Sequence, residues 1–217
     1  MKRTLGIIVL YALHGSAVAA QTSQIWPELD VFWRPAEHQR TFLELSMSTD
    51  RESDSREASI GLYQDYLRLP LGYVRAGYRY TFSVEDDSYR ESRGVGEFVV
   101  SSGLPLALRL VNRVRTELRW VNGGYSWRLR ERIHVQYHLD PHIGHTRLAR
   151  FALAPYGTME VYYYSTYRSI ARIGGRVGTE MRLTPRWSTD LFIARQNNSR
   201  FTPRYVNALG LVAKLTM

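Results

Sequence analysis

The chain has 217 residues, of which 44% are hydrophobic and 23% are charged, and its formal net charge is +9. It contains no cysteine, which excludes a disulfide-stapled secreted domain and a lipoprotein anchored through a cysteine. Nearly all of the positive charge is arginine, spread along many segments and not gathered on one helix or loop, so nucleic-acid binding is not expected.

The first predicted element is an export signal at residues 1–20. Lys2 and Arg3 form a basic start, residues 5–13 are mostly apolar, and Val18-Ala19-Ala20 matches a small-residue cleavage pattern. The apolar run is too short for a transmembrane helix, which needs about 20 apolar residues. We therefore expect cleavage near Gln21 and a single mature domain at residues 21–217.

Alternating apolar and polar residues follow from there to the last residue. The stretch Tyr125–Leu139 shows the pattern best, because Trp127 and Leu129 alternate with Arg128 and Arg130. A period of two predicts a strand with one apolar and one polar face. The eleven candidate strands, in chain order, are Glu28–Arg34, Arg40–Ser48, Glu57–Arg68, Gly72–Phe82, Arg93–Ser101, Pro105–Trp120, Tyr125–Leu139, Leu148–Tyr164, Ile170–Leu183, Arg186–Gln196 and Tyr205–Met217.

Many such strands without covering helices predict an all-β fold, a transmembrane antiparallel up-and-down β-barrel of the bacterial outer membrane with an arginine-rich lumen. Short turns, such as Asn122-Gly123-Gly124, and longer charged connections support this prediction. The alternative is a secreted soluble barrel or sandwich with its apolar face inside. Because bacterial single-chain barrels have even strand numbers, we expect about 12 strands, one of them near Gln24–Pro27, with 10 as the alternative.

Two groups of residues test the prediction that the apolar face of each strand points outward into lipid. Glu131 and Asn112 interrupt apolar faces, so they must lie near a membrane boundary or a bulge must shift the local phase. The tryptophans lie near predicted strand ends, where amphipathic rings form a girdle at the level of the lipid headgroups. These residues are Trp26, Trp33, Trp120, Trp127 and Trp187.

The chain also resembles a known family. The motifs that carry the resemblance are Trp26-Pro27-Glu28-Leu29-Asp30, Arg75-Ala76-Gly77-Tyr78-Arg79-Tyr80, Asn112-Arg113-Val114-Arg115, Ser126-Trp127-Arg128-Leu129-Arg130, Pro155-Tyr156-Gly157-Thr158-Met159-Glu160-Val161, Arg195-Gln196-Asn197 and Asn207-Ala208-Leu209-Gly210-Leu211-Val212. They are similar to motifs of an uncharacterised family of small bacterial outer-membrane proteins, a domain of unknown function. The resemblance implies an outer-membrane β-barrel and no particular activity. The family's usual terminal aromatic residue is replaced here by Met217.

The polar face supplies the candidate functional residues, a ladder of charges that would share a narrow lumen. The ladder consists of Arg75, Arg79, Arg113, Arg115, Glu117, Arg119, Arg128, Arg130, Arg132, Glu160, Arg172, Arg176, Glu180 and Arg182. Unpaired arginines in a pore select anions. Arginines paired with carboxylates would instead form a plug that holds the strands together. We expect a structural or narrow anion-selective, pore-like envelope protein.

An outer-membrane enzyme acting on lipid or envelope substrates is the alternative function. His134 and His138 would share a lumen face with Ser126, which nucleophilic catalysis could use. We assign no catalytic residue, no metal site and no cofactor. The cluster His138, Asp140, His142 and His145 and the acidic segments Asp50–Asp54 and Glu85–Asp87 are interpreted as solvated turns and loops.

The expected partners follow from the predicted location. They are outer-membrane lipids including lipopolysaccharide, and the barrel-assembly machinery during insertion, with no nucleic acid. The sequence leaves the oligomeric state open.

Overall fold

The computed structural model describes residues 23–49, 56–84, 89–138, 152–200 and 204–217. The expected signal at residues 1–20 lies outside this part. Within the described residues, no helix is long and apolar enough to cross a membrane. The strands there are β1 (Ser23–Ala36), β2 (Gln39–Thr49), β3 (Arg56–Leu69), β4 (Gly72–Ser83), β5 (Arg90–Leu104), β6 (Leu108–Val121), β7 (Gly124–Tyr137), β8 (Ala152–Tyr164), β9 (Ser169–Arg182), β10 (Trp187–Asn198) and β11 (Tyr205–Thr216).

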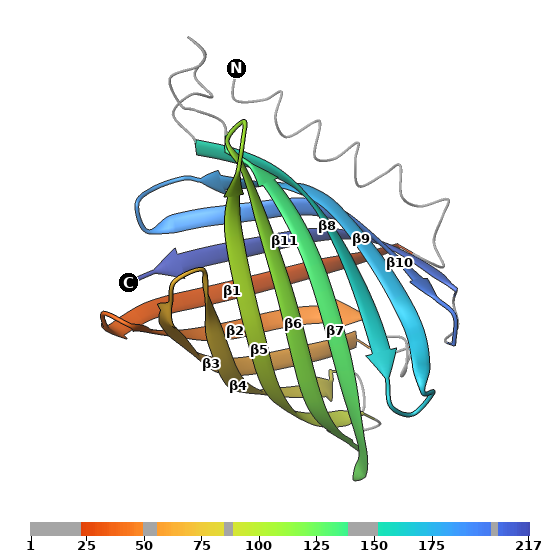
Figure 1. The fold of residues 1–217 in the computed structure, drawn as a ribbon. Helices are drawn as coiled ribbons and strands as arrows, with labels where there is room; N and C mark the ends of the chain where they lie inside the picture. Colours follow the sequence, from red (N-terminus) through yellow and green to blue (C-terminus); the bar gives the residue numbers. More distant parts are fainter. Residues whose placement is uncertain (1–22, 50–55, 85–88, 139–151, 201–203) are drawn as a thin grey trace.

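These strands form a closed β-barrel, so the predicted fold class is confirmed (Figure 1). Strands that are consecutive in the chain pair antiparallel, and β1 closes the barrel against β11. The closing pair is parallel, with Ser23 opposite Asn207 and Phe32 opposite Thr216. The strands are 11 to 15 residues long. That length suffices to cross a hydrocarbon layer, which takes a tilted strand of about 9–11 residues.

The strand number of eleven in the described residues is close to the expected 12. The additional strand expected near Gln24–Pro27 is the first part of β1. An odd number of strands makes the first and last strands run in the same direction, which is why the seam between β1 and β11 is parallel.

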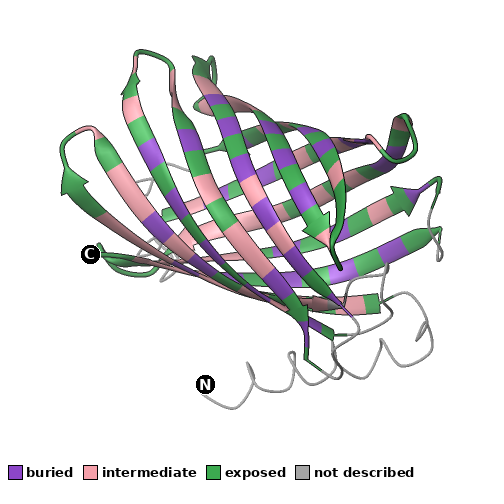
Figure 2. Cartoon of the chain, turned by 90° about the horizontal axis from the view of Figure 1, so that it is seen from below, coloured by how far each residue is buried: buried purple, intermediate pink, exposed green. Residues whose placement is uncertain are grey.

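The two faces of each strand differ sharply in exposure, as Figure 2 shows by the alternating colours along the strands. On the outer face, Leu62, Val177 and Ile193 expose 54%, 64% and 65% of their surface. On the inner face, Asp65 and Glu117 expose none. The barrel therefore has an apolar exterior and a charged interior, the reverse of a soluble β-barrel.

Successive connections lie alternately at the two ends of the barrel, and the longest one, between β7 and β8, is at the same end as the β1–β2 turn. We call the end with the connections β2–β3, β4–β5, β6–β7, β8–β9 and β10–β11 the loop end, and the opposite end the turn end. At the loop end, β6 and β7 are joined by Asn122 and Gly123, whose φ angles are 47° and 86°. Two positive φ angles favour Asn-Gly in a two-residue hairpin turn, as the sequence predicts here.

The outward polar residues of β6 and β7 lie next to each other. Asn112 Nδ2 donates a hydrogen bond of 3.1 Å to Glu131 Oε1 on the outer face. The register of this strand pair is unbroken, so no bulge shifts the phase. The two side chains instead satisfy part of each other's hydrogen-bonding capacity.

Three of the five tryptophans are exposed near strand ends, which is where the girdle prediction needs them. Trp120 and Trp127 are exposed at the loop end and Trp187 is exposed at the turn end. Trp26 was wrongly expected in the girdle, because it packs inside the barrel with its ring centroid 6.5 Å from that of Phe192.

Candidate functional site in the barrel interior

The ladder of charges predicted from the sequence lies on inward positions of β4, β6, β7, β8 and β9. Alternation places every second residue of a strand on the same face, so three or four arginines of one strand point into the barrel together. Most of the ladder is buried, whereas Arg182 is exposed near the turn end. The interior therefore concentrates guanidinium groups away from bulk water.

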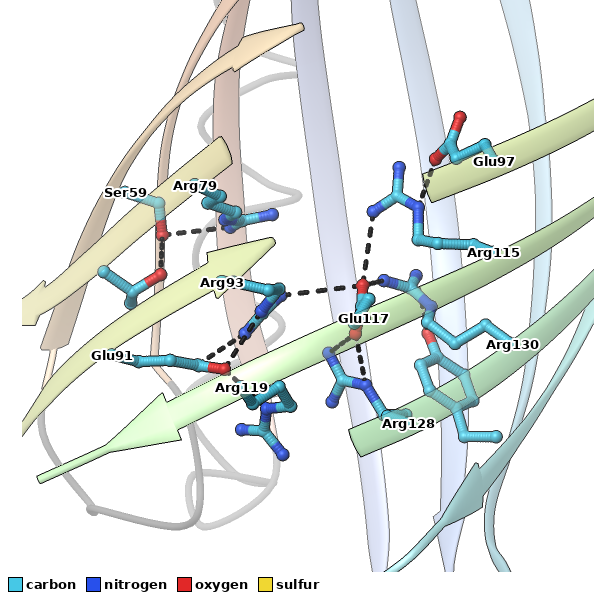
Figure 3. Close-up of polar contacts among 12 residues, drawn as sticks. Ser59, Arg79, Glu91, Arg93, Glu97, Arg115, Glu117, Arg119, Arg128 and Arg130 are labelled. Atoms are coloured by element: carbon cyan, nitrogen blue, oxygen red, sulfur yellow. Dashed lines mark hydrogen bonds and ion pairs between the residues drawn. The ribbon is translucent and has the colours of Figure 1, made fainter. Parts of the chain in front are cut away.

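Glu117 on β6 lies at the centre of this interior and has no exposed surface. Its carboxylate is 2.5 Å from Arg128 Nη2 and 2.8 Å from Arg130 Nη1, both on the neighbouring strand β7. Arg115 and Arg93 approach the same carboxylate at 3.5 and 3.8 Å. Figure 3 shows these four guanidinium groups converging on Glu117 from three strands.

Glu160 on β8 is a second centre. Its oxygens are 2.8 Å from Arg113, 2.9 Å from Arg130 and 3.1 Å from Arg132. The Tyr162 hydroxyl donates a further hydrogen bond of 2.8 Å. Arg130 therefore connects the carboxylate of Glu160 with that of Glu117.

Glu97 on β5 extends these ion pairs from β6 toward β4. It pairs with Arg115 and lies 3.4 Å from Arg75 Nη1 and 3.5 Å from Arg113 Nη1. Arg75 Nε also pairs with Asp65 on β3 at 2.5 Å.

Arg40 on β2 completes a continuous chain of ion pairs, with its Nη2 2.5 Å from Asp65. The chain, which we call the interior network, runs from β2 to β8 without a gap. Its members in strand order are Arg40, Asp65, Arg75, Glu97, Arg115, Glu117, Arg130 and Glu160.

Aromatic rings cover the guanidinium planes of the network. The Arg75 Cζ lies 4.1 Å from the ring centroid of Phe42, and Arg130 Cζ lies 4.6 Å from that of Tyr162. Arginine stacks on rings while its edge hydrogen-bonds a carboxylate, which lysine cannot do in the same geometry. This combination of ring stacking and hydrogen bonding explains why the positive charges of the interior are mostly arginines.

The opposite wall of the interior is apolar in one part. Phe192, Ala194, Ala208 and Val212 from β10 and β11 form one cluster with Tyr156. Ala208 and Val212 lie on the last strand, next to the parallel seam, and Trp26 of β1 packs against the cluster. Toward the turn end, the same strands carry inward charges, among them Glu180, Asp190 and Lys214.

Cavities lie above and below the network. A cavity of about 170 Å³ at the loop end is lined by Arg79, Arg93 and Arg172, among others. Two adjoining cavities of about 590 Å³ each lie at the turn end, where both are lined by Arg109 and Lys214. The interior is thus filled at mid-height and hollow at both ends.

Arg176 on β9 lies at the border between these spaces. It lines both the loop-end cavity and one turn-end cavity, and also a void of only about 10 Å³ between β8, β9 and β10. Its guanidinium lies 4.9 Å from the ring centroid of Phe192, and no carboxylate of the described residues pairs with it. Arg176 is therefore a charged group available to an anion.

Sequence reasoning missed Arg40 and Asp65 of the network, and also an adjoining cluster that contains Glu91 and Arg93. Glu91 and Arg93 pair at 2.5 Å near the loop end, and Arg119 joins them at 2.5 Å. Their strand was predicted to begin at Arg93, so Glu91 was assigned to a loop. The alternation of Glu91, Arg93 and Glu97 on one parity was the signal that could have found them.

The alternative catalytic arrangement of Ser126 with His134 is not formed. His134 Nδ1 hydrogen-bonds Thr158 Oγ1 at 2.9 Å, and its ring contacts Tyr156 at a centroid distance of 4.8 Å. Ser126 precedes His134 by eight residues on the same strand, a separation of about 26 Å.

The metal-ligand candidates Asp140, His142 and His145, and the acidic segments Asp50–Asp54 and Glu85–Asp87, lie outside the described residues. In the part of the chain that is described, no three histidine, aspartate or glutamate side chains are grouped so as to hold a metal ion.

Comparison with protein families places this interior in context. Residues 24–207 match the family model described as "Protein of unknown function (DUF2490)". The chain belongs to this family. The match extends over nearly all of the barrel, so the recognised resemblance is confirmed.

Among solved structures, the chain is similar to the β-domain of the Bordetella autotransporter Brka. The TM-score is 0.50 and the sequence identity is 13%, over 81% of this chain and 83% of that chain. At this identity the similarity concerns the fold alone. A comparison with curated proteins finds no match.

Proposed function

We propose that this family member is an integral β-barrel of the bacterial outer membrane whose lumen is closed at mid-height by the interior network. The apolar outer face and the aromatic residues at both ends support insertion into lipid. In this proposal the protein is a structural, non-catalytic envelope component that contacts outer-membrane lipids including lipopolysaccharide. The barrel-assembly machinery would engage the last strand, β11, during insertion.

The observation that carries the proposal is the continuity of the network across seven strands. Glu97 and Glu117 have side chains with no exposed surface, and each contacts three or more arginines. Carboxylates that are surrounded by arginines from adjacent strands crosslink those strands and fill the space between them. A water-filled pore would instead require these side chains to be exposed along the axis.

A narrow anion-selective passage is the second candidate function. Arg176 favours it, because this guanidinium has no carboxylate partner in the described residues and borders the cavities of both ends. An anion crossing the barrel would pass this arginine along the apolar wall.

Planar-bilayer recording of the purified protein discriminates between the two candidates. We expect a sealed barrel with no discrete conductance steps, although the protein is folded and inserted. Anion-selective steps in the wild type that Arg176→Gln diminishes would contradict closure and establish the passage. The matched control is Arg182→Gln, since Arg182 is an exposed arginine on the same strand and face, near the turn end.

A test of the enzyme alternative uses the same preparation. We expect no turnover of phospholipid or lipid A. Turnover that His134→Ala abolishes would overturn the non-catalytic assignment.

A further inference from the structure

The outer surface of the barrel has a groove over β8, β9, β10, β11 and β1. Gly157 and Gly175 are outward residues on β8 and β9, and neither projects a side chain from the wall. A Cβ added to Gly157 would meet no atom within 4 Å, so the surface there is open. The groove has a volume of about 1010 Å³. Its apolar side chains are Ile25, Val177, Ile193 and Leu209.

The groove becomes polar toward the loop end. Arg195 and Asn207 line it and lie directly opposite each other on β10 and β11. The Arg195 guanidinium lies over the Tyr205 ring, 5.0 Å from its centroid, and its Nε donates a 3.4 Å hydrogen bond to Asn197. In the described part of the chain, no carboxylate pairs with Arg195, and its side chain is exposed.

An arginine on the lipid-facing surface carries an energetic cost that depends on depth. The cost is largest at the bilayer midplane and falls toward zero near the interface. Arg195 lies three residues from the loop end of its strand, beside an aromatic ring, as expected at headgroup level. Guanidinium binds phosphate oxygens through paired charged hydrogen bonds, so a lipid phosphate at this level complements it.

We propose that this groove is a binding site for one anionic phospholipid-like molecule. Arg195 and Asn207 hold its phosphate, and its acyl chains lie along Gly157 and Gly175 beside the apolar side chains of β9 to β1. This inference deepens the proposed function and rests on it, because it requires the outer face of the barrel to be in lipid. It assigns specific residues to a lipid contact on one side of the barrel.

Native mass spectrometry of the detergent-purified protein tests the site. The probes are palmitoyl-oleoyl phosphatidylglycerol and the matched diacylglycerol, which has the same chains and no phosphate. We expect one tightly retained phosphatidylglycerol and at least fivefold weaker retention of the diacylglycerol. Replacement Arg195→Gln should weaken phosphatidylglycerol binding about fivefold, since one basic group near the surface contributes about 1 kcal/mol.

Gly175→Leu tests the groove separately from the charge. A Cβ at Gly175 meets only the Thr158 carbonyl oxygen at 3.8 Å, so the variant is expected to fold. Its side chain displaces about two methylene groups of the lipid, which should weaken binding of phosphatidylglycerol about tenfold. The matched control is Arg168→Gln, because Arg168 is an exposed arginine in the β8–β9 connection at the same end. It should leave binding unchanged.

Three outcomes would overturn the inference. These are equal retention of the two probes, equal effects of Arg195→Gln and Arg168→Gln, or occupation of the groove by a second copy, seen as a dimer that Gly175→Leu dissociates. The proposed function is judged apart from this, by insertion of the wild type into vesicles. A barrel that inserts but retains no lipid refutes the site alone, and one that does not insert refutes both.

Discussion

Glu117 shows how single residues determine the character of the interior. Four arginines surround a carboxylate that water does not reach. Burying such a group costs free energy, and the pairing offsets that cost without a guaranteed net gain in stability. Removing one member, however, leaves the opposite charges buried and unpaired, which is strongly unfavourable.

The replacement Glu117→Gln should therefore lower the free energy of unfolding by about 3–5 kcal/mol. Urea titration of the barrel in lipid vesicles measures the difference. Glu180→Gln is the control, because Glu180 pairs with Lys214 at 2.9 Å but its side chain is 37% exposed. Its loss should cost less than about 1 kcal/mol. Similar losses for the two variants would mean that the interior network is not a buried unit.

The sequence could predict the face of each charged residue but not its partner. Period two places Arg128, Arg130 and Glu117 inside, because it depends only on the strand. The pairing depends on the register between strands and on the rotamer of a long side chain, which no local pattern encodes. Trp26 was misplaced for a different reason, because its position near a strand end was weighed above its parity, which places it inside against Phe192.

Close packing between neighbouring strands restricts which residues fit at some positions, most clearly where β9, β10 and β11 are adjacent. The ring of Phe192 on β10 occupies the space beside Gly178 and Gly210 on the adjacent strands. A Cβ on Gly210 would lie 2.0 to 2.4 Å from three atoms of that ring. Position 210 on β11 therefore requires glycine, because the Phe192 ring of the neighbouring strand β10 fills the space that a side chain would occupy.

Gly210→Ala should destabilise the barrel by about 1–3 kcal/mol through overpacking. Thermal unfolding, followed by the shift in electrophoretic mobility between folded and heated samples, provides the measurement. In the double variant with Phe192→Leu, much of the stability should return. Gly96→Ala is the control, because its Cβ meets nothing within 4 Å. An equal loss in both glycine variants would contradict the steric explanation.

The extent of the strands could be predicted well, and the seam could not. The predicted first strand began at Glu28 and left out Pro27, which cannot donate a hydrogen bond to a sheet. In the structure Pro27 lies within β1, where the antiparallel pairing with β2 begins only at Glu28 and the residues before it pair across the parallel seam. Because an even strand number was expected, a barrel of eleven strands was not considered. Parallel pairing of β1 with β11 closes such a barrel without a twelfth strand.

At the scale of the whole molecule, the barrel separates an apolar exterior from a charged interior that the network fills at mid-height. The partition was predictable, because the alternation holds along nearly every strand. The network was not predictable, because it arises from contacts among seven strands at once. Both the proposed closure of the lumen and the proposed lipid site depend on this partition, and a soluble barrel with the same strands would have the faces reversed.

The most direct measurement of the partition is a spin-label scan of β2 in vesicles. The chain has no cysteine, so Leu45→Cys, Ser46→Cys, Met47→Cys and Ser48→Cys each introduce a single labelling site. Labels at 45 and 47 should collide with dissolved oxygen and be shielded from a water-soluble nickel chelate. Labels at 46 and 48, which border the loop-end cavity, should show lower oxygen accessibility. High chelate accessibility at 45 and 47 would show that the apolar face is not in lipid and would contradict the account.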